Sequence, residues 1–288
     1  MERLVKIAPW FFVFIWASGF VVAKYAFPNS DVIFFLSIRL FIAAAILAVA
    51  TLATGASLKL SASEFRASAV IGLALHGVYL GGVWHAIALG STSGVASVIT
   101  SMQPILVSII GITLLKEPLK SKQFIGLFLG FAGVVMVVLP KIESKDGISR
   151  TAIAFLVLGL AGSTSATLMQ KKLGHSVPLL AGTTYQFLFA AVALLVISLA
   201  TGRTALHWNL ESSLAMAWAV VVTSVIAILM LLWLLNKGSA ASVTSLLYLV
   251  PPTTALQAYL LFGEKVNTQG LIGIAMTALG VSLVIRLA

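Results

Sequence analysis

Residues 47–55, LAVATLATG, return later in the chain as residues 194–202, LLVISLATG. Six positions are identical when the sequence is shifted by 147 residues (194 minus 47). The same shift pairs rarer residues, among them Ser18 with Ser165, Lys24 with Lys171 and Pro104 with Pro251. Charged and proline matches seldom arise by chance in so apolar a chain, and one register covers nearly a whole half. The sequence therefore contains an internal duplication.

Each copy of the duplication holds five apolar segments. They run near residues 8–27, 32–53, 65–84, 93–115 and 122–139 in the first copy, and near 151–173, 179–200, 213–235, 240–262 and 268–286 in the second. A helix needs about 20 apolar residues to cross a bilayer, so each segment is long enough to span. The most polar stretch lies between the copies. We therefore expect a first repeat over 1–139, a linker over 140–150 and a second repeat over 151–288.

The odd number of segments fixes the relation between the repeats. Two tandem copies of a five-helix unit enter the membrane from opposite sides, so they must be inverted, as in many secondary transporters. The predicted fold is all-α, a polytopic membrane protein with ten transmembrane helices. Most loop lysines and arginines then lie on the side of both termini, which the positive-inside rule makes cytoplasmic.

Composition excludes several other classes of protein. The 288 residues are 60% hydrophobic and 9% charged, whereas soluble domains are about a quarter charged. Porin strands would alternate in hydropathy, and these runs are solid. The chain has no cysteine, which excludes disulfides and thiolate metal sites. The net charge of +10 reflects topology rather than nucleic-acid binding. We expect no metal and no cofactor.

The acidic residues argue against two further classes. All eight fall at helix ends or in loops: Glu2, Asp31, Glu64, Glu117, Glu143, Asp146, Glu211 and Glu264. Carriers that exchange protons or sodium usually keep an acid inside the bilayer, and an intramembrane aspartyl protease needs a pair. Gly90–Gly94 also misses the nucleophile elbow of a serine hydrolase, because Thr92 stands where serine should. We expect no enzyme.

Three polar residues lie deep in the apolar segments. Arg39 is about 12 Å past Asp31 along its helix, with no acid at its depth. It either caps broken helix ends or binds a solute carboxylate. His76 and Tyr79 are three residues apart and share a helical face. They either line a cavity or make a plain interhelical hydrogen bond.

Prolines and glycines mark the remaining segments. Pro104 in the fourth segment is matched by Pro251 and Pro252 in the ninth, where each proline frees the carbonyl four residues earlier. These prolines form either packing kinks or a pair of hinges. Small faces on the fifth and tenth segments let helices approach closely. Their residues are Gly126, Gly130, Gly133, Gly273, Thr277 and Gly280. The faces pack inside one molecule or form a homodimer seam, so the chain is a monomer or a homodimer.

The whole chain resembles the drug/metabolite transporter superfamily, in its EamA-type ten-helix branch. The resemblance rests on Trp16–Phe20 with Lys24, Arg39 before an alanine-rich run, Pro104–Val107, Leu114–Leu119, Gly126, Gly133, Pro251 and Phe262–Lys265. It implies a central cavity formed by both halves and a substrate among amino acids, metabolites, drugs, sugar phosphates or nucleotide sugars. The aromatic opening Trp10–Trp16 and His76–Tyr79 resemble bacterial exporters of aromatic and neutral amino acids. That resemblance implies a bacterial inner membrane.

We therefore expect a secondary transporter that exports small amphipathic solutes, foremost amino acids. Trp16, Arg39, His76, Tyr79, Tyr185 and Tyr248 are the candidate binding residues. Their rings suit an aromatic or cationic solute. Trp10, Trp84, Trp208 and Trp218 are expected in the interfacial belts. The alternatives are an organic-anion exchanger for sugar phosphates or nucleotide sugars, which would need more buried cations, and a channel or lipid-handling enzyme.

Overall fold

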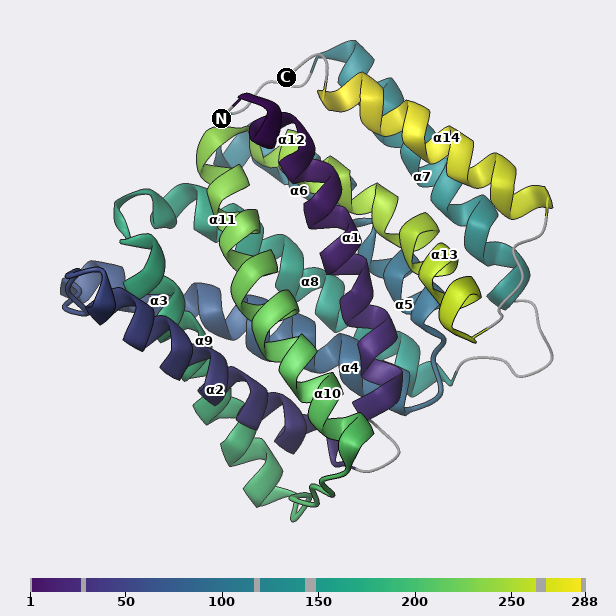
Figure 1. The fold of residues 1–288 in the computed structure, drawn as a ribbon. Helices are drawn as coiled ribbons and strands as arrows, with labels where there is room; N and C mark the ends of the chain where they lie inside the picture. Colours follow the sequence, from purple (N-terminus) through teal and green to yellow (C-terminus); the bar gives the residue numbers. More distant parts are fainter. Residues whose placement is uncertain (1, 27–29, 117–119, 143–148, 263–267, 286–288) are drawn as a thin grey trace.

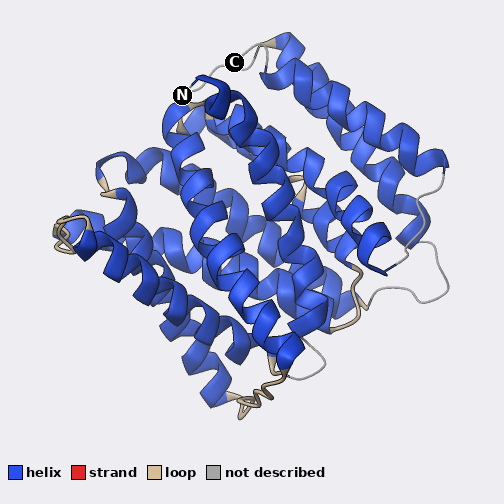
Figure 2. Ribbon diagram, viewed as in Figure 1, coloured by secondary structure: helices blue, strands red, loops and turns tan. Residues whose placement is uncertain are grey.

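The computed structural model describes residues 2–26, 30–116, 120–142, 149–262 and 268–285. Within these ranges the chain is helical with short loops, and it contains no β-strand, only an isolated bridge between Ser30 and Leu206 (Figure 2). The expected all-α fold is confirmed. Glu117, Glu264 and the middle of the expected linker, residues 143–148, lie outside the described residues.

Helices occupy all ten expected segments. The first half contains α1 (Glu2–Ala26), α2 (Val32–Ala53), α3 (Ala62–Gly72), η2 (Leu73–Leu80), α4 (Gly81–Ala88), α5 (Ser93–Thr100), α6 (Gln103–Leu114) and α7 (Ser121–Ile142). The second contains α8 (Arg150–Leu173), η3 (Gly174–Ser176), α9 (Leu179–Ala200), α10 (Leu210–Trp218), η4 (Ala219–Ile226), α11 (Ala227–Lys237), α12 (Ala240–Ser245), η5 (Leu246–Leu249), α13 (Val250–Phe262) and α14 (Thr268–Ile285).

In the part of the chain that the structure describes, six helical runs are long and apolar enough to cross a membrane. They are Ile7–Ala26, Val32–Ala53, Ala62–Ala88, Arg150–Leu173, Leu179–Ala200 and Leu210–Lys237. Gln103–Leu114, Ser121–Met136 and Thr268–Gly280 are shorter apolar helices. The interior of a bilayer holds no water to satisfy backbone polar groups, so a spanning segment must pair them internally, as a helix does. With several such apolar helices, this protein is a multi-pass membrane protein.

The stretch repeated at 47–55 and 194–202 ends two equivalent helices. Gly55 follows α2 with φ of 73°, and Gly202 follows α9 with φ of 67°. Glycine adopts this left-handed conformation without the steric cost that a Cβ brings. The amide of Gly55 donates to the carbonyl of Leu52 at 3.0 Å, which closes the last turn of α2. The duplicated Thr-Gly pair is thus a helix stop.

The candidate hinge prolines lie where helical geometry changes: Pro104 follows a break, and Pro251 and Pro252 follow a 3₁₀ turn. Pro104 lies in the first turn of α6, after a break at Ser101 and Met102, and Pro251 and Pro252 lie in the first turn of α13. Proline suits a first turn because the amide it lacks would have no helical partner there. The hydroxyl of Ser101 lies 3.2 Å from the carbonyl oxygen of Leu247, four residues before Pro251. The fourth segment is therefore a broken helix, whereas in the ninth the 3₁₀ turn η5 joins α12 to α13 without a loop.

Two π-helical segments interrupt the long third and eighth runs. η2 connects α3 to α4 and η4 connects α10 to α11 without a loop. Residues 73–80 shifted by 147 become 220–227, one residue from the bounds of η4. The wider π turn therefore occurs at equivalent places in both halves. π turns are rare in proteins, and those that occur are often found at functional sites.

The small faces of α7 and α14 pack against each other inside the molecule, where the two helices run side by side at one edge of the bundle (Figure 1). A Cβ on Gly133 would lie 2.6 Å from the carbonyl oxygen of Gly273, and one on Gly280 would lie 2.5 Å from the amide nitrogen of Gly130. Only glycine permits this approach. Of the two roles expected for these faces, packing within the chain is the one they serve.

Candidate functional site

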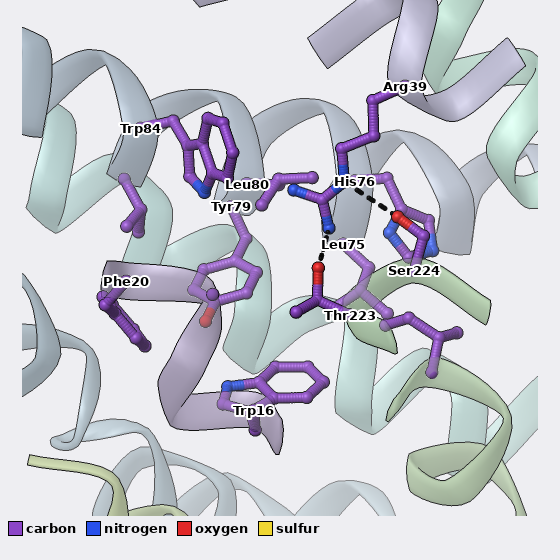
Figure 3. A pocket seen from close by; sticks show the side chains of 13 residues that line it. Trp16, Phe20, Arg39, Leu75, His76, Tyr79, Leu80, Trp84, Thr223 and Ser224 are labelled. Carbon is purple, nitrogen blue, oxygen red and sulfur yellow. Dashed lines mark hydrogen bonds between the residues drawn. The ribbon is translucent and has the colours of Figure 1, made fainter. Parts of the chain in front are cut away.

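A pocket lies where four apolar helical runs meet. Its lining comprises Trp16, Gly19 and Phe20 of α1, Arg39 of α2, Leu75, His76, Tyr79, Leu80, Val83 and Trp84 of the third run, and Thr223, Ser224 and Ile228 of the eighth. Trp16 lies near the middle of Ile7–Ala26, and Thr223 near the middle of Leu210–Lys237. The pocket is therefore at mid-depth of the helices, and residues from both halves line it (Figure 3).

Arg39 carries the charge of this pocket. It is 4% exposed, and two neutral hydroxyls of η4 hold it. Its Nε donates to Ser224 Oγ at 2.8 Å and its Nη2 donates to Thr223 Oγ1 at 2.8 Å. The guanidinium carbon lies 5.1 Å from the centre of the Trp84 ring, within cation–π range. Arg39 thus joins α2 of the first half to η4 of the second.

The π turn explains how two consecutive residues reach one guanidinium. Neighbouring side chains diverge by about 100° around an α-helix, which has 3.6 residues per turn. A π turn has more residues, so the divergence is smaller. Thr223 and Ser224 therefore both point at Arg39 (Figure 3). The hydroxyl of Thr223 also donates to the carbonyl of Ala219 at 2.8 Å, which leaves its oxygen as the acceptor for arginine.

Aromatic rings form another part of the lining. The rings of Trp16 and Tyr79 are nearly parallel, with 11° between their planes and 6.4 Å between their centres. Trp84 is buried, and its ring stacks on Phe35 at 5.8 Å. The expectation that Trp84 belongs to an interfacial belt was wrong. The third run continues to Ala88 rather than ending at residue 84, which places Trp84 inside the bundle.

His76 is buried beside Arg39, and its ring packs on the ring of Phe187 with 4.5 Å between the centres. Its Nε2 has no hydrogen-bond partner. Of the two expectations for His76, the pocket lining is what the structure contains, and this nitrogen is free for a solute or water.

Two candidate binding residues do not line the pocket. Tyr185 on α9 packs edge-on against Phe65 at 5.3 Å. Tyr248 in η5 is buried, and its ring lies against Gly130 of α7. The structure therefore brings Trp16, Arg39, His76 and Tyr79 together and leaves these two tyrosines elsewhere.

Sequence reasoning missed Thr223 and Ser224. The duplication contained a signal for them, because the shift of 147 residues carries His76 onto Thr223. The described residues hold no group of three or more His, Asp or Glu side chains that could bind a metal ion.

The pocket is small as it stands. The cavity has a volume of about 50 Å³. One water needs roughly 10–15 Å³ on this measure, so there is room for a few waters or one small polar group. A solute with a ring therefore needs the lining to move outward.

The chain is similar to known transporters over nearly its whole length. The EamA-like transporter family matches residues 10–139 and again residues 150–286. A WAT1-related chloroplastic protein of Arabidopsis thaliana is 25% identical, covering 99% of this chain and 69% of its own length. An uncharacterized transporter of Archaeoglobus fulgidus is 28% identical over 93% of both chains. The uncharacterized transporter YvbV of Bacillus subtilis is 25% identical, covering 95% of this chain and 89% of its own.

The fold is shared by a solved crystal structure. Its TM-score is 0.80 at 16% sequence identity, over 98% of this chain and 96% of that one. The likeness concerns the arrangement of helices alone.

Proposed function

This chain belongs to the EamA-like transporter family, and we propose that it is a secondary transporter that exports small amphipathic solutes, foremost amino acids and aromatic ones among them. The pocket is the observation that carries the proposal. It lies midway along apolar helices and combines aromatic rings with a buried guanidinium. Ligand sites are typically apolar with a few fixed polar groups of this kind.

We propose that transport occurs by alternating access between two inverted five-helix repeats, 1–139 and 151–288, joined by the linker 140–150. The pattern of helix contacts supports the repeats. α1 packs against α10, η4 and α11, while its counterpart α8 packs against α3, η2 and α4. α2 packs against its own counterpart α9, and α7 against α14. An internal twofold axis generates this exchange of partners, and inverted repeats typically hold the solute where they meet.

The proposed setting is a bacterial plasma membrane, with ten crossings and both termini in the cytoplasm. Excess lysine and arginine in the loops on that side supports the orientation. The described acids are Glu2, Asp31, Glu64 and Glu211, and all lie at or next to helix starts. No acid of the described part lines the pocket. These positions favour exchange or facilitated transport over proton coupling through a carboxylate.

An organic-anion exchanger is the second candidate. A phosphate dianion is usually held by several lysines or arginines. The pocket lining offers Arg39 alone among the described residues, so this candidate is less favoured. A channel or an intramembrane enzyme has no observation in its favour.

Uptake into proteoliposomes tests the proposal. Labelled amino acids should enter with saturable kinetics, whereas a channel would give flux that rises linearly. Gly19→Leu should reduce uptake of every solute, because Gly19 lines the pocket and a larger side chain there fills it; a Cβ added at Gly19 would already lie 3.8 Å from Thr223. Val49→Leu on the exposed face of α2 is the matched control and should leave uptake unchanged. Equal uptake by Gly19→Leu would place the pathway elsewhere.

A further inference from the structure

One nitrogen of Arg39 has no partner in the protein. Nε and Nη2 donate to Ser224 and Thr223, but Nη1 is buried without a hydrogen bond. A buried charged group with an unmet donor costs free energy, so such a donor is normally satisfied by a ligand or by water. Figure 3 shows this nitrogen turned away from the two hydroxyls, toward the side of the pocket where Tyr79 and Trp84 lie.

The guanidinium is held in place before any solute arrives. Two hydrogen bonds of 2.8 Å fix it from η4, and the Trp84 ring lies 5.1 Å from its carbon. Fixing a binding group in advance removes the ordering cost that binding would otherwise include. A planar guanidinium with free N–H donors matches a carboxylate. Thr223 and Ser224 carry no charge, so the positive charge of Arg39 is not neutralised within its hydrogen-bonded set.

The rest of the lining offers a cationic group of the solute no partner comparable to Arg39. Among the described residues that line the pocket there is no aspartate or glutamate. An ammonium group would meet rings and the unpartnered Nε2 of His76, beside a fixed positive charge. A second anionic group would also lack a partner of its own. The charges of the pocket are thus suited to one carboxylate and to no ammonium.

Building on the proposed transport function, we propose that Arg39 Nη1 binds the carboxylate of the solute, and that the solute class is monocarboxylates with an aromatic body. The carboxylate takes the free donor of Arg39, and the ring lies against Trp16 and Tyr79. The α-ammonium of an amino acid is tolerated but not recognised. The protein therefore carries the corresponding acids without an amino group as well as the amino acids themselves.

Three compounds with one benzyl group test this proposal. L-phenylalanine has both charged groups, 3-phenylpropanoate has the carboxylate alone, and L-phenylalaninamide has the ammonium alone. Each is added unlabelled, over a range of concentrations, to proteoliposomes taking up labelled L-phenylalanine. The two carboxylates should inhibit uptake at similar concentrations. The amide should need about tenfold more, because its neutral carboxamide oxygen replaces a charged acceptor and the charge-assisted hydrogen bond to Arg39 is lost.

Variants assign that preference to Arg39. Arg39→Gln keeps hydrogen-bonding capacity but removes the charge, and the difference between acid and amide should fall to about twofold or less; Arg39→Lys should keep part of it. Gln186→Leu is the matched control. Gln186 is the counterpart of Arg39 in the repeat, is buried to a similar degree and does not line the pocket. It should keep the full preference.

The outcomes separate the two proposals. Saturable uptake of phenylalanine with equal inhibition by amide and acid overturns carboxylate recognition and leaves the transport function standing. A preference for the acid that persists in Arg39→Gln also overturns the proposal. Another group would then recognise the carboxylate, and in the wild-type protein water would satisfy Nη1. If none of the three compounds competes and phenylalanine is not taken up, the aromatic solute itself is wrong. If Arg39→Gln does not fold, the wild-type series and Arg39→Lys decide.

Discussion

Trp16→Ala should weaken transport of ring-containing solutes far more than transport of small ones. The Trp16 ring lies in the pocket, nearly parallel to Tyr79 with 6.4 Å between the ring centres. This spacing is at the upper end for contacting rings, which pack at about 4.5–7 Å. An aromatic solute that enters between or beside these rings gains contact with both. Removing the Trp16 ring removes one of these two contacts.

The magnitude follows from the loss of one aromatic contact. Such a pair is worth about 0.5–1.5 kcal/mol beyond the area it buries. A loss of about 1 kcal/mol raises the apparent dissociation constant about fivefold, since 1.4 kcal/mol corresponds to a factor of ten. Alanine as a solute has no ring to lose contact, so its apparent affinity should change less than about twofold on the same scale.

The assay compares concentration dependences of uptake for labelled tryptophan and labelled alanine in proteoliposomes. Trp10→Ala is the matched control, because Trp10 is on the same helix and 59% exposed, outside the pocket. It should leave both solutes unaffected. Trp16 also packs on Phe12 at 5.2 Å, so the amount of folded protein must be measured for each variant. Equal losses for tryptophan and alanine, with normal folding, would mean that Trp16 only supports the bundle.

The remaining predictions concern topology, packing and coupling. The chain lacks cysteine, so Ser57→Cys and Thr204→Cys can be labelled singly; an impermeant reagent should reach only the second in intact cells, whereas labelling of both from outside contradicts inversion. Gly133→Ala should destabilise the protein by about 1–3 kcal/mol in thermal unfolding, as overpacking does. Gly77→Ala should not, because a Cβ at Gly77 meets no atom within 4 Å, and equal stability of the two variants would contradict the α7–α14 contact. A pH gradient should not concentrate solute in proteoliposomes, and concentration that survives His76→Ala would exclude both uncoupled transport and His76 as the proton carrier.

The fold was largely predictable because local rules determine it. Apolar runs of bilayer length mark the helices, and Gly55 and Gly202 mark where two of them stop. The start of α3 has a capping box, in which Ser61 accepts from the amide of Glu64 and Glu64 accepts from that of Ser61. These features involve neighbours in sequence. They need no knowledge of which helices touch.

The site was only partly predictable because it depends on the touching helices. Trp16, His76 and Tyr79 were found as polar or aromatic residues at mid-span, but their neighbourhood with Arg39 depends on how α1, α2 and η2 pack. The π turns were not predicted, since the hydrophobic pattern over so few residues does not separate a π turn from an α turn. The hydrogen bonds of Thr223 and Ser224 to one guanidinium come from the π turn η4, so they could not be predicted either.

The two halves differ most where the pocket lies, and this difference is informative. Arg39 reaches across to η4, whereas its counterpart Gln186 bonds within its own half to Gln170 at 3.3 Å. His76, the counterpart of Thr223, packs its ring on Phe187 where a polar partner would complete a second site. Of these two equivalent pairs, Arg39 and Thr223 are hydrogen-bonded across the halves, whereas Gln186 and His76 are not bonded to each other. A solute with a charge at one end and a ring at the other needs an asymmetric lining, and the duplicated sequence has diverged at the positions that would provide it.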